Sequence, residues 1–272
     1  MLHSRVLVTL VLLPIGLLAI YLGGPVYVAL VALILALAAW ELFQLFCASG
    51  YQPAGFLIVG GSLLVVLGRA WDGFASAAWM LSLLVLVSMA YHLVAYERGR
   101  DQAASDFMVT LSGALYIGWL GAYLISIRAL PDGLWWLLLV LPTVWLADSA
   151  AYFIGQRFGR RKLTPRLSPK KTWEGYLAGI VAGTLGGALL GQLWSSLAGS
   201  PTALGPLSGA ILGLLLSVLT TLGDLGESMI KRQSGMKDSG KLLPGHGGMF
   251  DRIDSWLWAA VIGYYAIAWL FM

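Results

Sequence analysis

Nine apolar segments divide the chain almost from end to end. They cover residues 6–22, 25–46, 54–69, 75–95, 107–128, 134–155, 174–197, 205–230 and 255–272. About 20 apolar residues in a helix cross a hydrocarbon core about 30 Å thick, and a helix satisfies its own backbone hydrogen bonds in lipid. The pattern therefore predicts an all-α polytopic membrane protein with about nine transmembrane helices.

Composition excludes a soluble domain. Hydrophobic residues make up 59% of the chain and charged residues only 11%, with a mean hydropathy of +0.82. A soluble domain is about one quarter charged. The net charge of +4 comes from basic residues beside apolar segments. We therefore expect lipid head groups or nucleotide phosphates as partners, and no nucleic acid.

The basic residues predict the orientation of the helices. With nine helices, all of the 17 lysines and arginines except Arg69 and Arg128 fall on the side that holds the N-terminus. Positive residues favour the cytoplasmic side of a membrane. We therefore expect a cytoplasmic N-terminus, an external C-terminus, and the charged loops 156–173 and 231–254 on the cytoplasmic face. Omitting the short segment 54–69 would place Arg5 opposite both loops.

The helices are expected to form two regions. Residues 1–130 would form about five N-terminal transmembrane helices, and residues 131–272 a catalytic region that includes both charged loops. The segments 174–197 and 205–230 carry glycines at four-residue spacing, which lets helix backbones approach closely in lipid. Glycine is also common in membrane helices generally. The glycines concerned are Gly179, Gly183, Gly187, Gly191, Gly205, Gly209 and Gly213.

Charge is concentrated in residues 224–254, which hold five of the 13 acidic residues and five of the 17 basic ones. Helical spacing within this stretch places four polar residues on one face of a helix, namely Asp224, Glu227, Ser228 and Lys231. An ionised side chain at mid-membrane costs about 2.5–3.5 kcal/mol, so each carboxylate in an apolar segment needs a partner or a role. These carboxylates are Glu41, Asp148, Asp224 and Glu227.

Several carboxylates near lysines and arginines suit Mg²⁺ bound together with phosphates. Asp148 and Asp224 are expected at similar depth, toward the cytoplasmic ends of their helices. Asp251 and Asp254 begin the last helix, where the helix dipole alone would favour a carboxylate. For Asp254 that explanation and a functional one weigh equally. A zinc site is not expected, because His246 is the only histidine nearby.

Two loops add further candidates. The loop 156–173 has seven basic residues and no acidic one, which positive-inside topology alone explains. Beyond that, residues 168–175 (Ser-Pro-Lys-Lys-Thr-Trp-Glu-Gly) form a polar block in which Thr172 would cap the next helix, with Glu174 in its first turn. Residues 243–248 are rich in glycine, so their backbone N–H groups can approach phosphate, although ordinary turns also use these residues.

The run from residue 228 to residue 254 resembles the signature of the phosphatidate cytidylyltransferases, or CDP-diacylglycerol synthases. Residues 223–228 and 168–175 and the position of Asp148 also resemble that family. The residues that carry the signature are Ser228, Lys231, Arg232, Lys237, Asp238, Gly240, Leu243, Pro244, Gly245, His246, Gly247, Gly248, Asp251, Arg252, Ile253 and Asp254.

The resemblance implies an enzyme of phospholipid biosynthesis in a bacterial-type inner (plasma) membrane, with its active site facing the cytoplasm. Its substrates would be phosphatidic acid and CTP, and its products CDP-diacylglycerol and pyrophosphate. The lipid phosphate would attack the α-phosphorus of CTP. Membrane lipids would surround the protein, and the resemblance allows a homodimer.

The resemblance also implies roles for residues. Asp224 and Asp251 are the first choices for ligands of one or two cations, Mg²⁺ among them, followed by Asp254, Glu227 and Asp148. His246 would donate a proton to pyrophosphate or anchor its loop. Asp238 is a further catalytic candidate. The residues expected to bind phosphates or substrates are Lys231, Arg232, Lys237, Lys241, Arg252, Lys170, Lys171, Ser168, Thr172, Glu174, Ser228, Gly247 and Gly248.

Two other functions fit parts of the pattern. A related transferase could act on another lipid phosphate, such as a polyprenyl or ether lipid, since the sequence does not specify the lipid tails. An ion-coupled transporter would also place carboxylates within helices. We favour it less, because these carboxylates cluster toward one surface and not at the midplane.

Overall fold

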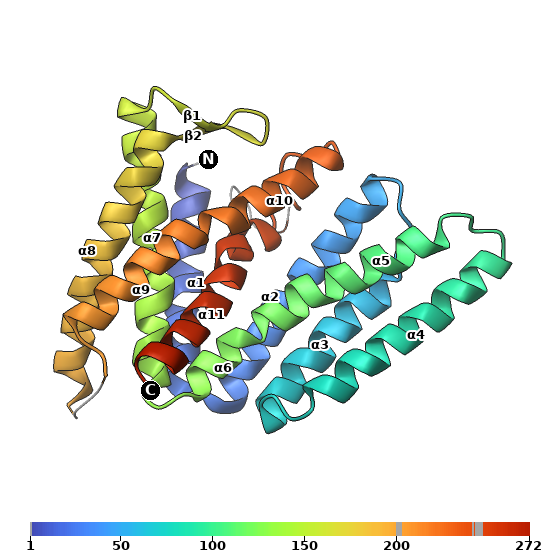
Figure 1. Ribbon diagram of the computed structural model, residues 1–272, viewed down its shortest axis with the longest axis horizontal. Coiled ribbons are helices and arrows are strands. Elements are labelled where there is room, and N and C mark those ends of the chain that lie inside the picture. The colour runs from blue at the N-terminus through green and yellow to red at the C-terminus, as the bar shows by residue number, and fades with distance from the viewer. Residues whose placement is uncertain (1, 200–202, 241, 243–246) are drawn as a thin grey trace. The chain divides into compact units, whose positions relative to one another are not determined.

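The computed structural model describes residues 2–199, 203–240, 242 and 247–272 (Figure 1). The N-terminal elements are α1 (Leu2–Leu22), α2 (Gly24–Ala48), α3 (Gly55–Asp72), α4 (Ala77–Glu97), α5 (Ala103–Ala114), the π-helical turn η1 (Leu115–Trp119) and α6 (Tyr123–Ala129). They are followed by α7 (Gly133–Phe158), β1 (Lys162–Thr164), β2 (Ser168–Thr172), α8 (Trp173–Ala198), α9 (Pro206–Leu219), α10 (Thr221–Gln233) and α11 (Phe250–Leu270).

The helices confirm the predicted class, an all-α polytopic membrane protein. Within the described residues, eight helical runs are long and apolar enough to cross a membrane, and Leu10–Leu22 of α1 forms a shorter apolar helix. Each of the nine expected segments coincides with one helix or with consecutive helices. Segment 107–128 is built from α5, η1 and α6, and segment 205–230 from α9 and α10.

The chain forms two compact units. One consists of residues 1–126 and 230–253, and the other of residues 127–229 and 254–272. The chain passes from one unit to the other within α6, within α10 and near the start of α11. The assignment of residues 131–272 as the catalytic region concerns function and stays a prediction.

The first unit contains α1 to α5, η1 and the 230–253 segment. Leu35 in α2 and Ile58 in α3 are fully buried. Several buried polar side chains of this unit have hydrogen-bond partners, which offset the cost of burying them. The Tyr27 hydroxyl donates to the Leu124 carbonyl at 3.1 Å. Asp106 accepts from the Gln52 amide at 2.8 Å and pairs with Arg100 at 2.7 Å, which ties two loops together.

In the second unit, glycines let α8 lie against α7 and α9 (Figure 1). A Cβ atom added to Gly187 would overlap the Gly209 carbonyl, and one added to Gly191 would overlap the Gly205 carbonyl. Because only glycine leaves room for these backbone contacts, the predicted close approach of the two helices is confirmed.

The polar connection before α8 is more ordered than the loop expected from sequence. Strands β1 and β2 pair antiparallel, with Lys162 opposite Thr172 and Thr164 opposite Ser168. At the end of β2, the Thr172 hydroxyl accepts a hydrogen bond from the Gly175 amide at 3.2 Å. The predicted helix cap is therefore confirmed, and the hairpin fixes where the lysines of β2 lie.

Candidate functional site

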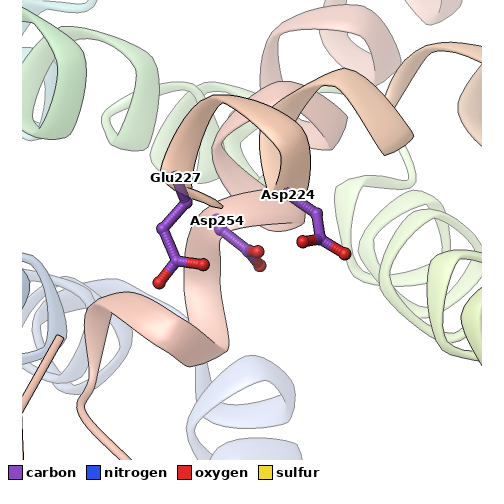
Figure 2. A group of neighbouring side chains, drawn as sticks. All are labelled: Asp224, Glu227 and Asp254. Carbon is purple, nitrogen blue, oxygen red and sulfur yellow. The ribbon is translucent and has the colours of Figure 1, made fainter. Parts of the chain in front are cut away.

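Three carboxylates gather in the second unit. Asp224 and Glu227 come from α10 and Asp254 from α11, and Figure 2 shows the three side chains next to one another. One oxygen from each lies within 4.8 Å of the others. We call these residues the carboxylate cluster.

Local structure explains why the cluster forms. The helix is interrupted at Thr220, whose hydroxyl donates back to the Leu216 carbonyl at 2.8 Å, and such a bond often bends a helix. In α10 the three-residue spacing then places Asp224 and Glu227 on one face. Gly223 lets α11 approach, because a Cβ atom there would lie 2.7 Å from the Asp254 carbonyl oxygen.

Two of the three carboxylates in the cluster are buried, and the cluster is rich in negative charge. Glu227 is 2% exposed and Asp254 9%. The Lys171 Nζ atom lies 2.6 Å from the Asp224 Oδ2 atom. Asp148 of α7 interacts electrostatically with both Lys171 and Asp224, and the similar depth of Asp148 and Asp224 in a membrane stays a prediction. Carboxylates this close repel one another unless cations accompany them.

The donor set fits a hard divalent cation. All three groups of the cluster are carboxylates, and oxygen ligands suit Mg²⁺ or Ca²⁺ better than Zn²⁺, which favours histidine and cysteine. Mg²⁺ in particular combines one or two carboxylates with waters and substrate phosphates. The cluster could therefore hold a metal ion, and Lys171 could contact an anion bound beside it.

A second polar group lies in the first unit, around Asp251. Its Oδ1 atom accepts a hydrogen bond from the Lys231 ammonium at 2.6 Å. Its Oδ2 atom accepts from the backbone amides of Ser239 at 2.9 Å and Gly248 at 2.8 Å. We call these residues the Asp251 network. In it, the first-choice metal ligand Asp251 is held by a lysine and two amides, and its binding of a metal stays a prediction.

Glycine is required beside Asp251. Gly247 has a φ of 83°, in the left-handed region that favours glycine. A Cβ atom there would lie 2.5 Å from the Asp251 Oδ2 atom. Gly247 and Gly248 were expected to bind substrate. Here Gly248 donates to Asp251 and Gly247 leaves room for it.

Glu41 is a site-adjacent residue to which the sequence alone gave no role. Its carboxylate accepts hydrogen bonds from the Ser239 hydroxyl and from the amides of Met249 and Phe250. The signal in the sequence was a carboxylate inside an apolar helix, which indicated that a partner exists. The partners are about 200 residues away in the chain, so the sequence did not identify them.

The other candidate residues occupy varied positions. Ser228 donates to Asp224 at 3.5 Å within α10. Glu174 accepts from the backbone amides of Arg160 and Arg161, the shortest at 3.0 Å, and so stabilises the start of the hairpin. Ser168 is half-buried in β2. Lys241 and His246 lie outside the described residues. The exposed candidates are Lys170, Arg232, Lys237, Asp238 and Arg252.

Known proteins are similar to this chain over the residues that form the carboxylate cluster and the Asp251 network. A model of the cytidylyltransferase family matches residues 3–270. A protein from Pseudomonas aeruginosa named phosphatidate cytidylyltransferase is 40% identical over 280 residues, covering 99% of this chain and 97% of that relative. Relatives of the same name from Brucella suis and Thermotoga maritima are 34% and 30% identical, over 97% and 87% of this chain and 92% and 86% of their own lengths.

Proposed function

Because the chain belongs to the cytidylyltransferase family, we propose that it transfers the cytidylyl group of CTP to phosphatidic acid, giving CDP-diacylglycerol and pyrophosphate. The match over residues 3–270 confirms the family and the class of enzyme expected from the sequence. The choice of phosphatidic acid as the lipid substrate rests on the names of the relatives and on the multi-pass membrane fold.

The observation that carries the proposal is the carboxylate cluster with its lysine. Nucleotidyl transfer depends mainly on positioning the phosphates and on neutralising their charge. Asp224, Glu227 and Asp254 offer oxygen ligands, of which those of Glu227 and Asp254 are buried. Lys171 brings a positive charge to Asp224. These residue types are the ones that handling a triphosphate beside a lipid phosphate requires.

We propose that the three carboxylates hold Mg²⁺, which when bound neutralises charge on the phosphates of CTP. A phosphate oxygen of phosphatidic acid forms a bond to the α-phosphorus of CTP. The bond from that phosphorus to the oxygen of the leaving pyrophosphate breaks. The lipid phosphate is already an anion, so the chain needs no general base to activate it.

Two lysines would position the anions. Lys171 reaches the carboxylate cluster from the end of β2, and its ammonium group would contact a phosphate bound there. Lys231 follows Glu227 by about one turn of α10 and is held by Asp251. An ammonium group that is already oriented loses less freedom when it binds phosphate than a mobile one does.

We also propose that the site faces the cytoplasm of a bacterial inner membrane, the side where CTP is made. The support is the placement of the basic loops, because all lysines and arginines except Arg69 and Arg128 share one face of the expected topology. Labelling of cysteines introduced at positions 238 and 200 tests this. Reagent should reach position 238 from the cytoplasm and position 200 from outside, and the opposite pattern would refute the orientation.

The experiment that tests the lipid substrate compares acceptors. Purified protein is supplied with Mg²⁺, labelled CTP and vesicles that contain either phosphatidic acid or a polyprenyl phosphate. We expect a labelled CDP-lipid with phosphatidic acid and none after Mg²⁺ is removed by chelation. If a labelled product forms with polyprenyl phosphate and none forms with phosphatidic acid, polyprenyl phosphate would be the substrate. No CDP-lipid from either acceptor would refute the proposed transferase.

A further inference from the structure

Glu41 is a buried carboxylate in an apolar helix, and the described residues that donate hydrogen bonds to it are close together in the chain. It is 5% exposed in α2. Its Oε2 atom accepts from the Ser239 hydroxyl at 2.8 Å and from the Phe250 amide at 2.9 Å, and its Oε1 atom accepts from the Met249 amide at 2.9 Å. A charge in such a place is costly unless it is hydrogen-bonded.

The bonds from Met249 and Phe250 stabilise the start of α11. The first backbone N–H groups of a helix have no partner within it, and a carboxylate beside them is favoured by the helix dipole. The partner is usually a side chain just before the helix. For α11 it is Glu41, supplied by a different helix far away in the sequence.

Ser239 connects Glu41 to Asp251. Its hydroxyl lies 2.8 Å from the Glu41 Oε2 atom and 3.0 Å from the Asp251 Oδ2 atom, and its one proton serves one carboxylate at a time. The Ser239 Oγ atom also accepts a hydrogen bond from the Asp251 backbone amide at 3.3 Å. A shift of Glu41 would therefore move Ser239 and, with it, the carboxylate that holds Lys231.

Close packing confirms that the segment is fitted to Glu41. A Cβ atom added to Gly240 would lie 2.5 Å from the Glu41 Oε1 atom, and the three nearest atoms all belong to Glu41. One added to Gly248 would overlap both Glu41 and Ser239. The glycines allow the backbone to lie directly on the carboxylate, so even a methyl group would displace it.

We propose that Glu41 is a positioning residue for the transfer reaction. Through Ser239 and the amides of Met249 and Phe250 it fixes Asp251, and Asp251 in turn fixes the ammonium group of Lys231. This inference rests on the proposed function. It gives the N-terminal half of the chain a part in catalysis beyond anchoring the protein in the membrane.

The central variant is Glu41→Gln, which keeps the shape of the side chain but replaces one acceptor oxygen by an NH₂ group that faces a donor. Misplacing a catalytic group by about 1 Å can lower a rate by about 100-fold. We expect kcat to fall by about tenfold or more while KM for CTP changes by less than about threefold. Hydrogen exchange at the Met249 and Phe250 amides should become faster.

The matched control is Asp106→Asn. Asp106 is also a buried carboxylate of the first unit, 1% exposed, and it also accepts a backbone amide and pairs with a basic side chain. We expect this variant to lose thermal stability to a similar extent but to keep its kcat. A purely structural role of Glu41 would instead lower stability and yield in Glu41→Gln without lowering kcat of the folded protein, and that result would overturn the inference.

A double-mutant cycle tests the contact itself. Gly240→Ala and Glu41→Asp should each lower kcat, the first by adding a methyl group and the second by shortening the carboxylate. In the double variant, the shorter side chain at position 41 makes room for the methyl group at position 240. The fold-loss in kcat should therefore be smaller than the product of the two single fold-losses, by about threefold or more. Independent losses would contradict the proposal.

These results separate the inference from the proposed function. An active wild-type protein whose Glu41→Gln variant keeps full kcat refutes the role of Glu41 alone. A wild-type protein that makes no CDP-lipid refutes the proposed function and any catalytic role of Glu41. In that case the hydrogen exchange still decides whether Glu41 holds the amides of Met249 and Phe250.

Discussion

The ammonium group of Lys171 lies 2.6 Å from the carboxylate of Asp224. This ion pair joins the end of a short hairpin to a helix that carries two members of the carboxylate cluster. Both side chains remain partly exposed, at 26% and 34%. A ligand could therefore reach either partner, and the pair marks where phosphate and metal chemistry would meet.

Replacing Lys171 tests that interpretation. Lys171→Met removes the positive charge but keeps an unbranched side chain, so phosphates beside the cluster lose a neutralising group. We expect kcat/KM for CTP to fall by about 100-fold, a loss of about 2.7 kcal/mol of transition-state stabilisation. Steady-state kinetics measure it. Lys162→Met, in the paired strand β1, is the control, and an equal loss in both variants would show a general effect of charge on the hairpin.

Asp254→Asn tests the metal assignment. An amide is a weaker ligand for Mg²⁺ than a carboxylate, and one negative charge of the cluster is lost. We expect the Mg²⁺ concentration that gives half-maximal activity to rise by about tenfold, as removal of one ligand typically weakens a site. A Mg²⁺ titration measures this, with Asp101→Asn as an exposed control. An unchanged titration would remove Asp254 from the site.

Asp251→Asn separates two roles of that residue. The variant loses the ionised partner of Lys231, while its remaining oxygen can still accept from the Ser239 or Gly248 amide. We expect kcat to fall by about 100-fold because the ammonium group is no longer held in place. The Mg²⁺ titration of this variant tests the predicted metal role, because a titration that matches the wild type would leave Asp251 only as the partner of Lys231. A shifted titration would instead make Asp251 a metal ligand.

The glycine contact between α8 and α9 predicts a loss of stability. Gly187→Val places a branched Cβ atom against the Gly209 carbonyl. Overpacking of this kind costs about 1–3 kcal/mol, so we expect a clearly lower melting temperature in detergent. Gly60→Val is the control, because a Cβ atom there meets nothing within 4 Å. Equal melting temperatures for the two variants would contradict the close packing.

Local patterns in the sequence predicted the helices and part of the site. Segment length and hydropathy located every expected helix, and helical spacing placed Asp224 and Glu227 on one face of α10. The Thr172 cap followed from the residue type and its position before an apolar run. These features depend on residues within one or two turns of each other, which a sequence displays directly.

Features that depend on distant residues could not be predicted in the same way. The strands β1 and β2 have only three and five residues and no alternation of apolar positions. The contact of Glu41 with Ser239 joins residues 198 positions apart. The approach of Asp254 to α10 depends on Gly223, whose role is apparent only when α11 lies beside it.

The fate of the α-phosphate tests the central claim most directly. Purified protein in Mg²⁺ and phosphatidic acid is given CTP labelled at either the α- or the γ-phosphorus. We expect the α label in the lipid and the γ label in pyrophosphate, and we expect Asp224→Asn, folded and membrane-inserted, to lose about 100-fold or more of this transfer. Label from the γ-phosphorus in the lipid, or full transfer by Asp224→Asn, would contradict the account.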